Sequence, residues 1–134
     1  MRFKPLLATI SAALVMVPPA LAQDLASPEG IWEIDSRDSR YQVELCGDDG
    51  QSLCGTLVWL AESAQSEENL QYMNSTIIDH AEPTGENSWN GRLSLWGQSA
   101  NGTITQVSDD TIELEGCAFI VVCRTYTLNR YSDV

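Results

Sequence analysis

The side chains with the most distinctive chemistry in this sequence are a single histidine and four cysteines. His80 lies between Asp79 and Glu82, where an imidazole could serve as a general base or a metal ligand. A metal site needs further ligands at suitable spacing, and the sequence contains no Cys-x-x-Cys motif. A Ser–His–Asp triad needs a defined nucleophile, whereas the serines fall in expected loops or at polar strand positions. We therefore expect no catalytic residue, no metal site and no cofactor.

The 19 acidic residues could in principle supply a carboxylate pair for glycoside hydrolysis. Most of them fall in expected turns or at outward-facing strand positions, whereas a catalytic acid needs an enclosed environment. Asp48-Asp49-Gly50 lacks the remaining positions of a calcium-binding loop and predicts a hairpin turn instead. These patterns favour a protein that is not an enzyme.

The cysteines Cys46, Cys54, Cys117 and Cys123 form an even set in a short chain, which is typical of a disulfide framework. Three connectivities are possible for four cysteines. Alternation of apolar and polar residues places all four thiols on outward-facing positions, and each consecutive pair flanks a short turn. We predict disulfides Cys46–Cys54 and Cys117–Cys123, each bridging the two strands of one hairpin.

The N-terminus has the pattern of a secretory signal peptide. Arg2 and Lys4 precede an apolar run over residues 6–17, and Ala20-Leu21-Ala22 provides a cleavage site before Gln23. The run is too short to span a bilayer, and no cysteine follows it that could carry a lipid. We expect a signal peptide at 1–22 and a single β-barrel domain at 23–134, located in the bacterial periplasm or secreted, without a membrane anchor.

The charge of the chain constrains its partners. The formal net charge is −12, and cleavage before Gln23 would remove Arg2 and Lys4 and make it more negative. Such a surface repels phosphate backbones and anionic lipids, so we expect neither a nucleic acid nor a membrane surface as a partner.

From Gly30 onward the sequence consists of short alternating runs separated by turn residues, which predicts an all-β fold. Residues 61–75 lack this alternation and predict a long loop or short helix across one end. About eight strands fit the rest, and closing the sheet removes exposed edges, so we predict a small antiparallel up-and-down barrel. The expected strands are 30–35, 40–46, 53–60, 76–80, 89–97, 102–107, 111–117 and 123–131, with turns at 48–50, 82–85, 101–102 and 109–110.

The two ends of the expected barrel carry residues suited to its closure. Gly30-Ile31-Trp32 opens the first strand and Arg130 lies near the end of the last, where a guanidinium could stack on the indole. This arrangement resembles the lipocalin and wider calycin barrels, whose opening Gly-x-Trp packs against an arginine of the final strand. The resemblance implies a structural role for Arg130.

A fuller resemblance extends over about residues 28–131. The motifs are Gly30-x-Trp32, Cys46-Gly47, Leu53-Cys54-Gly55, Val58-Trp59-Leu60, Trp89-x-Gly91, Gly116-Cys117, and Cys123-Arg124-Thr125 with Arg130. Together they resemble the bacterial exported family catalogued as domain of unknown function 2147. The resemblance implies a lipocalin-like barrel in the cell envelope and brings no established activity with it.

Large aromatic residues are the candidate ligand-binding set: Trp32, Tyr41, Trp59, Trp89, Trp96 and Tyr126. Those that point inward either fill the barrel or line a cup open at one end. We expect a non-enzymatic binding module that takes a small apolar or amphipathic ligand in the barrel mouth. The alternative is a protein-binding barrel, such as an exported protease inhibitor, which would use its N-terminal tail or hairpin tips. An open cup of roughly 300 Å³ or more would favour the small ligand.

Overall fold

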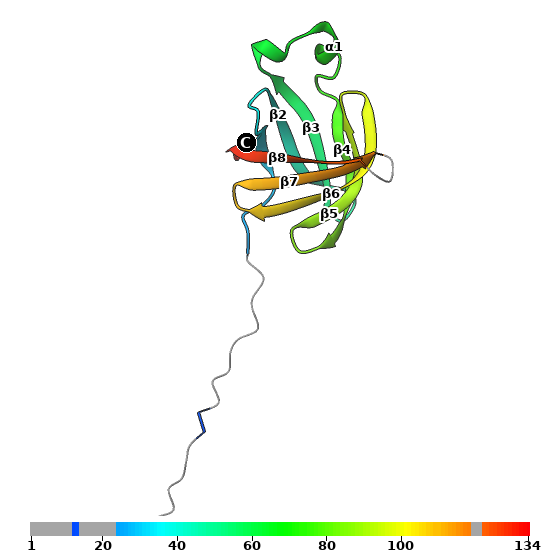
Figure 1. The fold of residues 1–134 in the computed structure, drawn as a ribbon. Helices are drawn as coiled ribbons and strands as arrows, with labels where there is room; N and C mark the ends of the chain where they lie inside the picture. Colours follow the sequence, from blue (N-terminus) through cyan, green and yellow to red (C-terminus); the bar gives the residue numbers. More distant parts are fainter. Residues whose placement is uncertain (1–11, 14–23, 119–121) are drawn as a thin grey trace, which may run out of the picture.

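The computed structural model describes residues 12–13, 24–118 and 122–134 (Figure 1). Apart from residues 12–13, the predicted signal peptide at 1–22 lies outside the described residues. The eight strands are β1 (Gly30–Ile34), β2 (Ser39–Cys46), β3 (Ser52–Leu60), β4 (Thr76–Gly85), β5 (Ser88–Leu95), β6 (Gln98–Ser108), β7 (Thr111–Ala118) and β8 (Val122–Ser132).

Every strand pairs antiparallel with its neighbour in the chain, and β1 also pairs with β8, so the sheet closes into a barrel. The predicted all-β, eight-stranded, up-and-down barrel is therefore confirmed. Because successive strands run in opposite directions, the barrel has two ends with different connections. We call the end where β1 begins and β8 finishes the terminal end, and the opposite end the helical end.

The helical end carries the one long connection of the described barrel, between β3 and β4. It contains a 3₁₀ turn, η1 (Glu62–Ala64), and a single helical turn, α1 (Glu67–Leu70), which lie above the strands in Figure 1. Ser66 caps α1 by accepting a hydrogen bond from the Asn69 backbone N–H. The expected loop or short helix over residues 61–75 is thus confirmed.

Two predicted turns were displaced. Strand β4 continues through Pro83 to Gly85, and the following turn includes Asn87, whose φ is 57°. The Asn101-Gly102 pair lies inside β6 rather than at a turn. A Cβ on Gly102 would collide with the Leu93 side chain and the Glu115 carbonyl, so this glycine permits close approach of neighbouring strands.

Inward-facing residues from all eight strands form one hydrophobic core. The fully buried large side chains include Trp32, Tyr41, Leu53, Leu57, Ile78, Ile104, Ile112 and Leu128. Most alternate with outward-facing residues along their strands, as expected for a barrel with one face toward the core.

The Arg130 side chain closes the terminal end of the barrel, next to Trp32 of the hydrophobic core. Its guanidinium carbon lies 4.4 Å from the centroid of the Trp32 ring. The same group donates hydrogen bonds to the carbonyls of Ser27 (2.7 Å), Glu29 (2.9 Å) and Asp109 (2.9 Å), and its side chain is only 10 % exposed. This is the arrangement that the Gly-x-Trp and arginine pattern predicts.

Gly30 is required at the same seam. Its φ is +145°, and a Cβ there would lie 2.6 Å from the Ser132 carbonyl oxygen. A side chain at residue 30 would therefore push β1 away from β8.

Both predicted disulfides are confirmed. Cys46–Cys54 bridges β2 and β3 at the terminal end, with 6.0 Å between the Cα atoms. Cys117–Cys123 bridges β7 and β8 near the helical end, with 3.9 Å between the Cα atoms. In the part of the chain that the structure describes, no helix is long and apolar enough to cross a membrane.

Candidate functional site: a cavity at the helical end of the barrel

A cavity of about 360 Å³ opens between β5, β6, β7 and β8 toward the helical end. Apolar side chains make up most of its wall, and the polar groups gather among its exposed residues. The lining residues are Leu93, Leu95, Trp96, Gln98, Ser99, Ala100, Gly116, Val122, Arg124 and Tyr126. The barrel is thus hollow toward its helical end. A second hollow of about 450 Å³ lies at the terminal end, between residues 24–28 and the β4–β5 turn, with Trp89 in its wall.

Small residues in β6 and β7 create this space. Ala100 and Gly116 occupy wall positions where the strands would otherwise carry bulky side chains. A Cβ on Gly116 would meet Leu93 at an ordinary contact distance of 3.7 Å, so the position has room that the glycine leaves empty.

Trp96 forms a corner of the cavity wall, where the β5–β6 turn and a neighbouring tyrosine hold it. Trp96 and Gly97 form the two-residue β5–β6 turn, with φ values of 53° and 79°. The indole packs edge-to-face on Tyr72, with ring centroids 6.0 Å apart and an interplanar angle of 80°. It is 37 % exposed and lines the cavity at its mouth.

A smaller hollow of about 150 Å³ adjoins the same turn and shares Leu95, Trp96 and Ser99 with the larger cavity. Tyr41 lines it from the core side. Burial raises the pKa of Tyr41 above its ordinary value of 10.0, although a hydrogen bond with Ser39 acts in the opposite direction. The Tyr41 hydroxyl lies 2.7 Å from Ser39 Oγ, so it is a fixed, neutral part of the wall.

The structure thus brings three of the six aromatic candidates to this end of the barrel, namely Tyr41, Trp96 and Tyr126. Trp32 and Trp89 instead fill the core toward the terminal end. Their indole N–H groups donate to the carbonyls of Pro28 (2.9 Å) and Gln51 (3.0 Å), which anchors the chain segments next to them.

Trp59 lies on the outside of the barrel. The register between β2 and β3 shifts between Arg40 and Tyr41, so Arg40 pairs with Trp59 and Tyr41 pairs with Leu57. This bulge reverses the alternation after Leu57 and turns Leu60 inward in place of Trp59. The Trp59 ring stacks on the Arg40 guanidinium, 3.8 Å from ring centroid to guanidinium carbon.

Arg124 is the site residue that the sequence reasoning missed. It lines the cavity among apolar neighbours and is exposed to solvent. The signal was present, because Arg124 has the same strand phase as Tyr126 and Leu128, and Leu128 is fully buried. An arginine on the inward phase at the start of a barrel strand is a candidate ligand contact.

One family model matches most of the chain, which shows the family to which the protein belongs. A family model described as "Uncharacterized protein conserved in bacteria (DUF2147)" matches residues 30–130, which is nearly the whole barrel from Gly30 to Arg130. The chain belongs to this family. The match therefore covers both seam residues, both disulfides and every residue that lines the cavity at the helical end. No curated protein and no solved structure matches the chain significantly.

Proposed function

We propose that this DUF2147 protein is a non-enzymatic binding module of the bacterial envelope that holds one small amphipathic molecule with an anionic head group. The observation that carries the proposal is the cavity of about 360 Å³ at the helical end. Small-molecule sites are concave, mostly apolar and roughly 300–1,000 Å³ in volume. A hollow of this kind favours a small ligand over a protein-binding barrel, which would use hairpin tips or the N-terminal tail.

The wall determines the class of ligand. Leu93, Leu95, Trp96 and Tyr126 supply apolar and aromatic surface for a hydrocarbon group. Arg124 supplies a cation among the exposed lining residues and forms no ion pair with any described residue, whereas Arg40 and Arg130 do. A carboxylate at the mouth would therefore meet an arginine able to bind it with two parallel hydrogen bonds.

Few polar side chains are buried inside the barrel. In the described part of the chain the buried polar side chains are Ser39 and Gln106. The Ser39 hydroxyl is hydrogen-bonded to the Tyr41 hydroxyl, and Gln106 Nε2 donates to the Ala26 carbonyl, whereas Gln106 Oε1 has no hydrogen-bond partner among the described residues. These contacts fix strands and the N-terminal segment, which supports binding rather than catalysis as the role of the barrel. The two disulfides fit the oxidising periplasmic or extracellular location proposed for the protein.

A head-group series tests the proposal. Decanoate, decanol and decyltrimethylammonium share one chain and differ in charge, and their binding is measured by calorimetry and by the fluorescence of the tryptophans. We expect decanoate to bind about tenfold more tightly than decanol, since a charge-assisted contact is worth roughly 1.5–3 kcal/mol before desolvation. The formal net charge of −12 would by itself favour the cation, so preference for the anion identifies a local contact.

Two variants locate that contact. Arg124→Ala should abolish the preference for decanoate over decanol, whereas Arg92→Ala, which removes an exposed arginine outside the cavity, should leave it intact. Trp96→Ala should weaken the binding of all ligands that bind. Equal affinity for the three amphiphiles would reject the anionic head group, and no binding of any would reject the small-ligand function in favour of a protein partner.

A further inference from the structure

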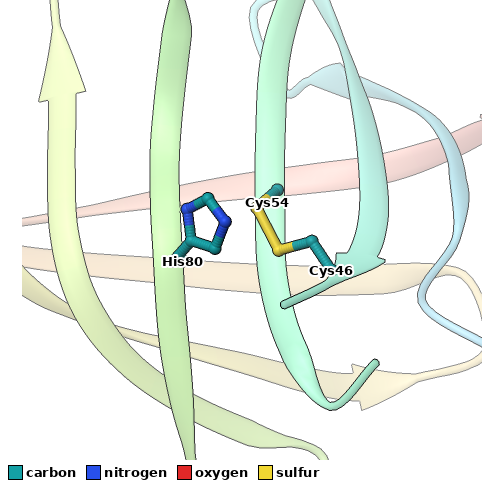
Figure 2. A group of neighbouring side chains, drawn as sticks. All are labelled: Cys46, Cys54 and His80. Atoms are coloured by element: carbon teal, nitrogen blue, oxygen red, sulfur yellow. A yellow bond between two sulfur atoms is a disulfide. The ribbon is translucent and has the colours of Figure 1, made fainter. Parts of the chain in front are cut away.

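The imidazole of His80 lies beside the Cys46–Cys54 disulfide on the outer surface of the barrel at its terminal end (Figure 2). The two sulfur atoms and a ring nitrogen of His80 all lie within 4.8 Å of one another. The sulfurs come from β2 and β3, and the imidazole comes from β4. Three neighbouring strands thus place three soft or borderline metal ligands at one point, far along the barrel from the cavity.

A backbone irregularity aims His80 at this point. Leu53 pairs with Ala81 and Gly55 pairs with Ile78, so β4 holds an extra residue between these pairs. His80 lies in that bulge with a φ of +45°, a conformation that side-chain-bearing residues rarely adopt. Bulges of this kind redirect side chains and concentrate near functional sites, and strain at a non-glycine residue is kept where the surroundings require it.

Asp79 orients the His80 imidazole for metal binding. Its Oδ1 lies 2.8 Å from Nδ1 of His80 and can accept the Nδ1–H hydrogen bond. That bond fixes the tautomer in which Nε2 carries the free lone pair. Histidines that bind metal ions almost always donate their other N–H to a carboxylate or carbonyl in this way.

We propose that reduction of the Cys46–Cys54 disulfide converts this cluster into a site for a thiophilic metal ion of the zinc class. A dithiol reductant gives two electrons and two protons, becomes a disulfide itself, and leaves two cysteine thiols. The metal ion then displaces both thiol protons and binds the two thiolates and His80 Nε2, with water as the fourth ligand. Zn–S distances of about 2.3 Å and Zn–N distances of about 2.0 Å bring such ligands within about 4 Å of one another.

The second disulfide of the chain provides a comparison for the proposed site. The Cys117–Cys123 disulfide also has a third potential ligand nearby, but it is the carboxylate of Glu115 and not an imidazole. Sulfur and imidazole suit zinc-class ions, whereas an exposed carboxylate is a weak addition to two thiolates. The proposal therefore predicts one metal ion at the first pair and a much weaker interaction at the second.

The test uses the protein in two backgrounds that each retain one cysteine pair. Cys117→Ser with Cys123→Ser keeps the pair beside His80, and Cys46→Ser with Cys54→Ser keeps the other. Each is reduced with a phosphine and titrated with Co²⁺, whose absorption reports thiolate ligation and tetrahedral geometry, and Zn²⁺ affinity follows by competition with a chromophoric chelator. We expect one Co²⁺ per chain in the first background after reduction, displacement by Zn²⁺, and no binding before reduction.

Single substitutions in the first background identify the third ligand. His80→Ala should weaken Zn²⁺ binding at least tenfold, and Asp79→Ala about tenfold, as loss of a supporting carboxylate does elsewhere. Glu82→Ala serves as the matched control and should have no effect. In redox titrations, Zn²⁺ at a hundredfold excess over its Kd should raise the reduction midpoint of the disulfide by about 60 mV.

Several results would overturn the proposal. Equal Zn²⁺ affinity with and without His80, or equal affinity in the two backgrounds, would reduce the site to a pair of ordinary thiols. Circular dichroism shows whether the reduced chain stays folded. If it unfolds, Zn²⁺ must restore the folded spectrum in the first background and not in its His80→Ala variant, and failure to do so also rejects the site.

Discussion

At the scale of single residues, the outer surface of the barrel has a packed cluster of its own. Arg40 lies between the rings of Trp59 and Tyr131, 3.8 Å and 3.7 Å from their centroids. Its Nε donates to Glu33 at 2.8 Å, and both side chains of this pair are about one-fifth exposed. One guanidinium thus connects β8, β1, β2 and β3 from outside, opposite the side on which Arg130 joins β8 to β1.

Replacing Arg40 tests how much this outer cluster stabilises the barrel. Arg40→Ala should lower the free energy of unfolding by about 1–3 kcal/mol, because two cation–π contacts and a largely buried ion pair are lost together. Urea denaturation followed by circular dichroism measures the change. Arg40→Lys keeps the charge and loses the planar stack, so it should recover only part of the stability; full recovery would show that charge alone matters.

The outward orientation of Trp59 could not be predicted from the sequence. Leu53, Gly55 and Leu57 face inward, so strict alternation predicts an inward Trp59. One extra residue in β3 reverses the phase, and bulges leave no reliable mark in a single sequence. The inward-facing position of Arg124 was predictable from its strand phase. The cavity beside it was not, because its volume depends on the side chains of four strands.

At the scale of elements, each disulfide belongs to one hairpin. Cys46 and Cys54 are 8 positions apart in the sequence, and Cys117 and Cys123 are 6 positions apart. Strand parity was sufficient to predict both pairings from sequence, because a hairpin places residues of equal phase on one face. The displaced turns had a different cause: Asn101-Gly102 has turn composition, but the glycine is needed for close packing inside β6.

Removing one disulfide should cost less stability than a long-range crosslink would. With Cys117→Ser and Cys123→Ser together, we expect a loss of about 2–3 kcal/mol in the free energy of unfolding, since the closed loop is short. Guanidinium denaturation with retained native circular dichroism checks this value. A chain that fails to fold without this pair would contradict the view that the barrel itself holds the strands together.

At the scale of the whole molecule, the contact between Trp32 and Arg130 is the closure that joins the two ends of the barrel. Ile31 pairs with Ser132 and Trp32 pairs with Arg130, so the seam connects residues about a hundred positions apart. The closed architecture was predictable because Gly30, Trp32 and Arg130 stand at the start of the first strand and near the end of the last. The cavity volume was not predictable, since a barrel of this size is either filled or hollow depending on the side chains inside it.

A double-mutant cycle tests the seam. Trp32→Ala should cost about 3–5 kcal/mol through the cavity that it leaves, and Arg130→Ala about 1–3 kcal/mol through lost stacking and unpaired carbonyls. The double variant should cost less than the sum, because each single change already removes the shared contact. Strict additivity in equilibrium unfolding would contradict a direct energetic coupling across the seam.

The placement of the disulfides also makes their formation independent of the last step of barrel assembly. Each cysteine pair can meet as soon as its own hairpin forms, since the partners are only 8 or 6 positions apart in the sequence. Pairing of β1 with β8 instead requires both ends of the chain, and it must overcome the largest loop-closure entropy in the fold. Neither disulfide therefore depends on closure of the barrel: an oxidoreductase can crosslink either cysteine pair as soon as its hairpin has formed, while β1 and β8 are still apart.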